Sequence, residues 1–124
     1  MLTNFEHITR ELSDEERRLL PVLIAGFAKR TKSNPVHAEY VVSKINEKKI
    51  IEGVFTHSRL RKLCNFIRRN GLLPLVATSK GYYVSRDNAE IRRAVRSLYE
   101  RANAIVTAAK GLEKFITSDD SKGI

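Results

Sequence analysis

Polar side chains that can hydrogen-bond to base edges recur along one face of a helix predicted over residues 57–70. They follow one another at spacings of four, three and four residues, which places them on the same helical face: Ser58, Lys62, Asn65 and Arg69. In the major groove, Asn can bond to adenine, Lys to guanine and Ser to either base. The pattern therefore indicates that Ser58, Lys62 and Asn65 read the sequence of double-stranded DNA.

Positive charge is concentrated around this face. The chain has 124 residues and a net charge of +9, yet residues 57–86 hold seven basic groups and no acid. Protein surfaces normally mix both signs, so a block of one sign favours an anionic partner, either nucleic acid or an anionic membrane. These cations are therefore expected to lack counter-ions within the chain, so that the partner supplies the negative charge. The alternative is an ordinary solvated helix. In the DNA interpretation, the surrounding arginines bind phosphates, which fix position without reading sequence: Arg59, Arg61, Arg68 and Arg69.

The basic helix has a defined start and end. Thr56 is a good N-cap residue, and Gly71 supplies the left-handed residue that ends a helix. One side is apolar and is expected to seat the helix on a core: Leu60, Leu63, Cys64 and Ile67. Large side chains flank the polar face: Arg61 and Arg68 at one edge, Arg59 and Phe66 at the other.

A β-hairpin is predicted directly after this helix, in LLPLVATSKGYYVSR. Short β-prone runs surround the tight turn SKG, although Pro74 limits pairing at the start of the first strand. Lys80 at the tip is a candidate DNA contact; the alternative is a turn residue that serves solubility. Tyr82 and Tyr83 point to opposite faces, so one is expected in the core and the other against the last helix or the DNA backbone.

A first helix is predicted to begin at Ser13 and to end near Thr31. Ser13 and Glu16 have the spacing of a capping box, in which each side chain bonds to the other residue's backbone N–H. Pro21 removes a backbone hydrogen bond and should kink or split this helix. Its buried face combines apolar residues at helical spacing: Leu19, Leu20, Leu23, Ile24 and Phe27.

A second, shorter helix is predicted over roughly residues 36–47, or with a start only after His37. It is expected to turn three side chains to the core: Tyr40, Val41 and Ile45. The chain then turns in KKIIEGVF, which contains Gly53 and has no helical period.

The last predicted helix runs from about Asn88 to Thr117, a length of roughly 45 Å. Apolar residues recur along it at alternating spacings of four and three, which form an unbroken heptad seam: Ile91, Val95, Leu98, Ala102, Ile105, Ala109, Leu112 and Ile116. The seam is longer than a domain of this size, so pairing with a second copy is favoured. Packing within one chain is the alternative.

The order of helix, helix, basic helix and hairpin is that of a winged helix-turn-helix, whose third helix lies in the major groove. The runs LLPVLIAGFAKR and FTHSRLRKLCNFIRRNGLLPLVATSKGYYVS, with the heptad helix, resemble small winged-helix proteins of bacterial prophages and related mobile elements. The resemblance covers about residues 13–116 and is sharpest in RLRK, NGLLPLVA and SKGYYV. It implies DNA binding in phage replication or regulation. The segment HAEYVVSKIN departs from it, because it lacks the expected Thr-Asn start.

The expected fold class is therefore mainly α with a small β-hairpin: a winged helix-turn-helix followed by a long C-terminal helix. Residues 1–12 are interpreted as an extension, 13–86 as the DNA-binding domain, 87–117 as the dimerisation helix and 118–124 as a frayed tail. One cysteine excludes an internal disulfide and fits a reducing compartment. The N-terminus lacks the apolar run of a signal peptide, and LLPVLIAGFA is too short to span a bilayer, so a cytoplasmic location is expected.

No enzyme, metal or cofactor is expected. His57 and Cys64 fall on one side of the basic helix, but two ligands are too few for a structural zinc site. No catalytic triad or phosphate-binding glycine loop is apparent, and no carboxylate pair is expected at a cleft, because Glu15 and Glu16 are cap residues. The main alternative function is a protein–protein interaction module that uses the winged domain and the C-terminal coiled-coil helix. A membrane surface is disfavoured because the apolar face of the basic helix is needed by the core, and RNA because no aromatic platform is present.

Overall fold

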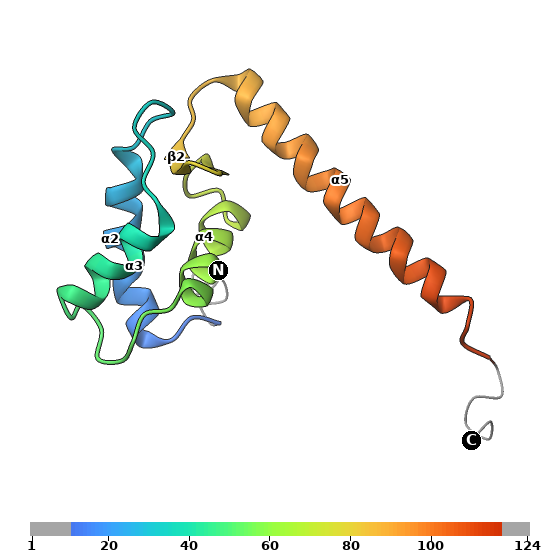
Figure 1. Ribbon diagram of the computed structural model, residues 1–124, viewed down its shortest axis with the longest axis horizontal. Helices are drawn as coiled ribbons and strands as arrows, with labels where there is room; N and C mark the ends of the chain where they lie inside the picture. Colours follow the sequence, from blue (N-terminus) through green and yellow to red (C-terminus); the bar gives the residue numbers. More distant parts are fainter. Residues whose placement is uncertain (1–10, 118–124) are drawn as a thin grey trace, which may run out of the picture. The chain divides into compact units, whose positions relative to one another are not determined.

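A computed structural model of the chain describes residues 11–117. The described part divides into two compact units, with the boundary in the sequence after Asp87. Among the described residues, the first unit holds three helices and a hairpin, and the second holds one long helix (Figure 1). In chain order the elements are α2 (Asp14–Ala28), α3 (Ala38–Glu47), α4 (His57–Arg69), β1 (Leu75–Thr78), β2 (Gly81–Val84) and α5 (Asn88–Glu113). The expected mainly helical fold with a small antiparallel hairpin and a long C-terminal helix is confirmed.

The core of the first unit lies between α2, α3 and α4, with β1 packed on α4 and β2 on α2. Its largest fully buried side chains are Phe27, Phe55, Phe66, Leu19, Leu60, Leu63 and Ile67. Each such side chain contributes about 1.5–3 kcal/mol when it leaves water. Leu12, which falls in the predicted N-terminal extension, is also buried in this core. The frayed tail predicted over 118–124 and most of the extension lie outside the described residues.

Helix α2 begins with the predicted capping box. The Ser13 hydroxyl accepts the N–H of Glu16 at 3.1 Å, and the Glu16 carboxylate accepts the N–H of Ser13 at 2.9 Å. The helix is not split at Pro21, one of the two expected outcomes, because one helix runs from Asp14 to Ala28. Pro21 lies on the exposed side, where water can bond to the carbonyl that it leaves free. Buried leucines before and after it hold both halves on the same core.

Helix α3 takes the later of its two expected starts, after His37. Val36 is extended instead: its N–H and C=O bond to the C=O and N–H of Tyr82 at 2.9 and 2.8 Å. This bridge ties the chain before α3 to the hairpin. Ile45 is buried as predicted, but the expected burial of Tyr40 is wrong, because its side chain is 51% exposed.

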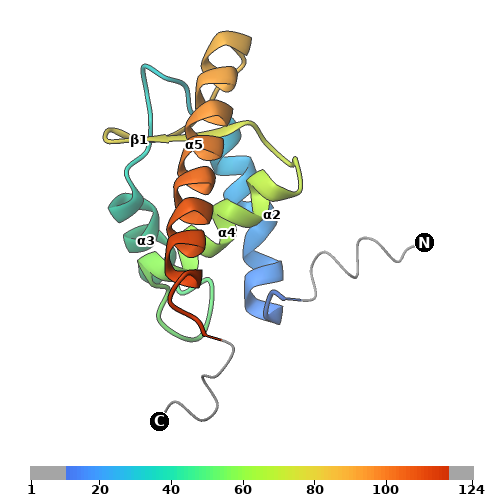
Figure 2. The same ribbon diagram turned by 90° about the vertical axis from the view of Figure 1, so that its right-hand side faces the viewer.

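The hairpin has a two-residue connection, Ser79-Lys80, with Thr78 opposite Gly81 and Leu75 opposite Val84. Tyr83 is buried, and the half-buried Tyr82 places its ring 5.4 Å from that of Phe27 on α2. Figure 2 shows the hairpin extending beside the end of the helical unit where α3 begins.

Gly81 is required where β2 meets Val36. Its φ is +127°, and a Cβ at this position would lie 2.5 Å from the carbonyl oxygen of Val36. Gly81→Ala is therefore expected to lower the free energy of unfolding by at least about 2 kcal/mol. Urea denaturation measures this change. Gly53→Ala is the control, since no atom lies within 4 Å of its added Cβ; equal effects of the two substitutions would contradict the prediction.

Helix α5 buries none of its residues within the described part of the chain. It ends at Glu113 and not at Thr117 as predicted, because Lys114, Phe115 and Ile116 donate to carbonyls three residues back and form a turn. Ile116 therefore lies beyond the helical seam. Across residues 11–117, no helix is both long enough and apolar enough to cross a membrane.

Candidate nucleic-acid interface

Helix α4 is seated on the core by one apolar face and begins at a side-chain cap. The Thr56 hydroxyl accepts the N–H of Arg59 at 3.1 Å, as the sequence predicted. Gly71 follows the helix with a φ of +63°, also as predicted. Phe66 is buried and not at an edge of the polar face, which places a further large side chain in the core. The solvent face carries the predicted base readers and several cations: Ser58, Arg61, Lys62, Asn65 and Arg69.

The expectation that the cations of α4 lack internal counter-ions is wrong for one edge of the helix. Arg59 Nε lies 3.1 Å from Glu16 Oε2, and Lys62 Nζ lies 3.0 Å from Glu16 Oε1. Glu15 is also 3.5 Å from the Arg59 guanidinium. Further along, Arg69 forms an ion pair with Glu11. The start of α2 and the residues before it therefore supply the acids that α4 itself lacks.

Glu16 is the centre of this acid-paired edge. Its side chain is buried at 6% exposure, and it accepts hydrogen bonds from Ser13, Arg59 and Lys62. Burial by itself raises the pKa of the carboxyl, but the bonds from Ser13, Lys62 and Arg59 outweigh it and lower the pKa from 4.5 to about 2. Glu16 therefore stays ionised, and it closes the helix cap while holding α4 on α2.

The opposite edge of α4, which faces the hairpin, has a different character. Arg68 donates from Nε to the carbonyl of Leu75 at 3.0 Å and from Nη1 to Asn65 Oδ1 at 3.5 Å. Neither Arg61 nor Arg68 has a carboxylate partner among residues 11–117. Lys80 at the hairpin tip is likewise exposed and without an acid in the described part. Arg61 and Arg68 of α4 and Lys80 of the hairpin are together called the hairpin-side basic edge.

A concave cleft lies where the hairpin meets the N-termini of α3 and α4. It has a volume of about 640 Å³ and is lined by His37, Ala38, Glu39, His57, Ala77, Thr78, Ser79, Gly81 and Tyr82. Helix N-termini present free N–H groups and a partial positive charge, which favour phosphate. The first turn of α4 contains no acid, whereas Glu39 stands in the first turn of α3.

Two residues of the cleft, His37 and His57, were not among the predicted binding residues. His37 is the N-cap residue of α3, and His57 is the first residue of α4. The only sign of a role for these histidines in the sequence was their position, because each stands at a predicted helix start. Both line the cleft because the bridge between Val36 and Tyr82 brings the start of α3 to the hairpin, and the sequence pattern did not indicate this bridge.

Cys64 is separated from this cleft. It is buried beside Tyr82, and burial raises the pKa of the thiol to about 11. Burial likewise raises the pKa of Tyr82 to about 12, against smaller opposing effects of Arg68 and Arg61. Both groups therefore stay protonated as part of the core. Within the described residues, no group of three or more His, Cys, Asp or Glu side chains could hold a metal ion.

Comparisons with known proteins add no assignment to this geometry. The chain matches no family model, no curated protein and no solved structure. The functional interpretation therefore depends on the charges, contacts and helix ends of the chain itself.

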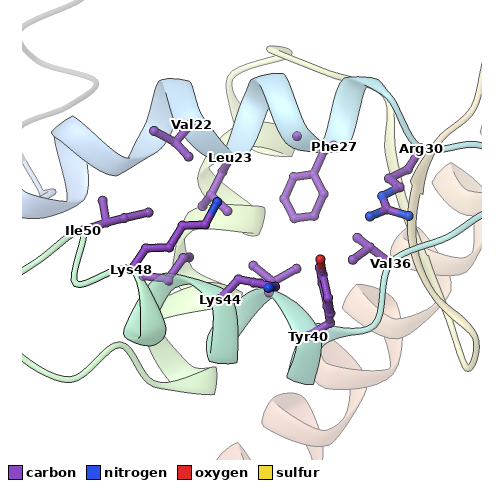
Figure 3. A pocket seen from close by; sticks show the side chains of 12 residues that line it. Val22, Leu23, Phe27, Arg30, Val36, Tyr40, Lys44, Lys48 and Ile50 are labelled. Atoms are coloured by element: carbon purple, nitrogen blue, oxygen red, sulfur yellow. The ribbon is translucent and has the colours of Figure 1, made fainter.

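A second hollow lies on another side of the first unit, between α2 and α3 (Figure 3). It has a volume of about 170 Å³ and an apolar floor that includes Leu23, Phe27 and Ile45. Three cationic side chains also line it: Lys44 of α3, and Arg30 and Lys48, which follow the ends of α2 and α3. Lys44 is paired with Glu47 at 3.2 Å. None of the residues predicted to bind DNA lines this groove.

Proposed function

We propose that the chain is a non-enzymatic, sequence-reading, double-stranded DNA-binding protein of the winged helix-turn-helix type. Helix α4 enters the major groove, and the hairpin acts as a wing on the backbone. The role is that of a phage-type regulator or replication accessory, which the resemblance to small prophage proteins supports. The observation that carries the proposal is the cleft between two helix N-termini and the hairpin, next to the hairpin-side basic edge.

The arrangement of the polar side chains supports this orientation. Ser58 and Asn65 lie on the exposed face of α4, where Asn65 also accepts from Arg68. Arg61 lies between them in sequence on the same exposed face. A helix placed in the major groove presents such a face to base edges and phosphates together.

The internal ion pairs narrow the predicted contact set. Arg59 and Lys62 both bond to the buried Glu16, and Arg69 bonds to Glu11. Moving either cation away from Glu16 would leave a buried carboxylate without one of its two counter-ions, which is costly. We therefore assign Arg59, Lys62 and Arg69 mainly to the fold, and Ser58, Arg61, Asn65, Arg68 and Lys80 to DNA.

The proposal is tested by the salt dependence of duplex binding, measured by fluorescence anisotropy on a labelled mixed-sequence duplex. Affinity is expected to fall steeply as salt rises, because each phosphate contact releases a counter-ion. Arg61→Ala should weaken binding and reduce the slope of log K against log salt by about 1.

Arg18→Ala is the matched control, because it removes the same charge from an exposed site in the N-terminal half of α2. The hairpin instead adjoins the C-terminal end of this helix, through Phe27 and Arg30. Arg18→Ala should leave the slope unchanged. Binding that is absent, insensitive to salt, or reduced equally by the two substitutions would contradict the proposal. Selection of bound duplexes from a random pool then identifies the target sequence.

A further inference from the structure

Helix α5 has an exposed apolar stripe along its length. Leu98 is 44% exposed, Ile105 69% and Leu112 71%. Tyr99 and Val106 widen the stripe and are 68% and 50% exposed. A helix gains most of its stability from the packing of such a face, and α5 has 26 residues with none buried. The stripe therefore indicates a missing partner.

We infer that α5 pairs in antiparallel orientation with α5 of a second copy of the chain. With the two-fold axis between residues 103 and 104, each seam position faces another seam position of the second copy. The layers are Val95 against Leu112, Leu98 against Ala109, and Ala102 against Ile105, and symmetry forms each of them twice. Ile116, which lies beyond the helix, is not needed for any of these layers.

The sizes of the seam residues favour this orientation over a parallel one. In the antiparallel pair, each alanine faces a leucine or an isoleucine, so every layer contains at least one large side chain. In a parallel pair in register, Ala102 faces Ala102 and Ala109 faces Ala109. Two layers would then hold only methyl groups while neighbouring layers hold two large residues. Interdigitation of large and small side chains fills the space between helices without voids.

The flanking positions agree with the same register. Immediately after the seam positions Ile91, Leu98, Ile105 and Leu112 come Arg92, Tyr99, Val106 and Glu113. In an antiparallel pair these flanking residues face one another, so Arg92 meets Glu113 of the second copy and Tyr99 meets Val106. A parallel pair would instead place Arg101 beside Val106 and Ala108 beside Glu113. Charge complementarity and coverage of Tyr99 therefore both select the antiparallel arrangement.

The antiparallel pair has a consequence for the assembly. The N-terminal ends of the two α5 helices, at residue 88 of each copy, lie at opposite ends of the pair, roughly 46 Å apart in this register. Each end carries one copy of residues 11–87. The pairing does not depend on the proposed DNA binding, so either proposal can fail without the other.

The oligomeric state tests the pairing first. Light scattering of the full chain is expected to give twice the monomer mass of 14.1 kDa. Leu98→Asp places a charge in the seam and should reduce the mass to that of a monomer. Ser97→Asp adds the same charge beside the seam and should leave the dimer intact. A monomeric full chain, as expected if α5 instead packs in the groove between α2 and α3 of its own chain, would overturn the inference.

Disulfide trapping then tests the orientation. Val95→Cys and Leu112→Cys chains are oxidised separately and as a mixture. The antiparallel pair predicts a mixed disulfide between the two variants and none in either alone, because two copies of residue 95 lie roughly 26 Å apart in that register. Disulfides formed by each variant alone would show a parallel pair and overturn the inference. Native Cys64 is 1% exposed and does not compete.

Discussion

Glu16→Gln is expected to lower the free energy of unfolding by about 2 kcal/mol at neutral pH. Gln can still accept the N–H of Ser13, so most of the helix cap survives. It cannot neutralise Arg59 and Lys62, whose nitrogens lie 3.1 and 3.0 Å from the Glu16 oxygens. The expected loss of stability is no larger than about 2 kcal/mol, because Arg59 still pairs with Glu15 and because Lys62 is 43% exposed and can be solvated. Urea denaturation at pH 7 measures the change.

The pH dependence of stability distinguishes the contribution of the Glu16 charge from the contribution of the shape of its side chain. The folded pKa of Glu16 is about 2, below its ordinary value of 4.5. Its contribution is therefore complete above pH 4.5 and is lost as pH falls towards 2. The wild-type chain and Glu16→Gln should converge in stability over this window. Glu47→Gln, which removes an exposed acid paired with Lys44, is the control and should change stability by less than about 0.5 kcal/mol. A constant difference between wild type and Glu16→Gln at every pH would contradict the prediction.

Local features of the fold could be predicted from the sequence because they depend on residues close together in the chain. The capping box of Ser13 and Glu16, the Thr56 cap and the left-handed Gly71 all follow from spacings of a few residues. The buried face of α4 also follows from helical period, apart from Phe66. The winged helix-turn-helix itself stays a proposal.

The charge distribution of the site could not be predicted in this way. The acids that neutralise Arg59, Lys62 and Arg69 stand 43, 46 and 58 residues away in the chain. Residues 57–86 contain no acid, but acids from residues 11–16 lie beside them in the folded chain. The acids in the first turn of α2 are fully explained by their place at a helix N-terminus. Nothing further in the sequence therefore indicated that they also act as counter-ions for α4.

The ion pairs also change how α4 can meet DNA. The edge that adjoins α2 is neutralised by Glu11, Glu15 and Glu16, whereas the edge that adjoins the hairpin has no acid among the described residues. A polyanion is therefore attracted to one side of the helix. This asymmetry favours docking towards the hairpin and the cleft, where the N-terminus of α4, whose first turn holds no acid, adds a partial positive charge.

Simultaneous reversal of charge at the hairpin-side basic edge should have the largest effect on function. Arg61→Glu/Lys80→Glu removes two proposed phosphate contacts and places two acids beside the backbone of DNA. Duplex affinity is expected to fall by about 100-fold or more at low salt, and the slope of log K against log salt should decrease by about 2. Both side chains are exposed, so the free energy of unfolding should change by less than about 1 kcal/mol. Anisotropy across a salt series and urea denaturation of the same samples measure the two quantities.

Arg18→Glu/Lys48→Glu changes the net charge by the same amount at exposed positions outside the cleft and the basic edge. If the overall field of the protein attracts DNA, both double variants weaken binding to a similar extent, because long-range attraction depends on total charge. If the hairpin-side basic edge forms the contact, only Arg61→Glu/Lys80→Glu has the large effect.

Lys62→Met tests whether Lys62 serves the fold or reads DNA. It should lower stability, because the ion pair with Glu16 is lost, and should leave duplex affinity within about threefold. If Lys62 instead reads guanine directly, its loss would cost about 1–3 kcal/mol of discrimination between bases.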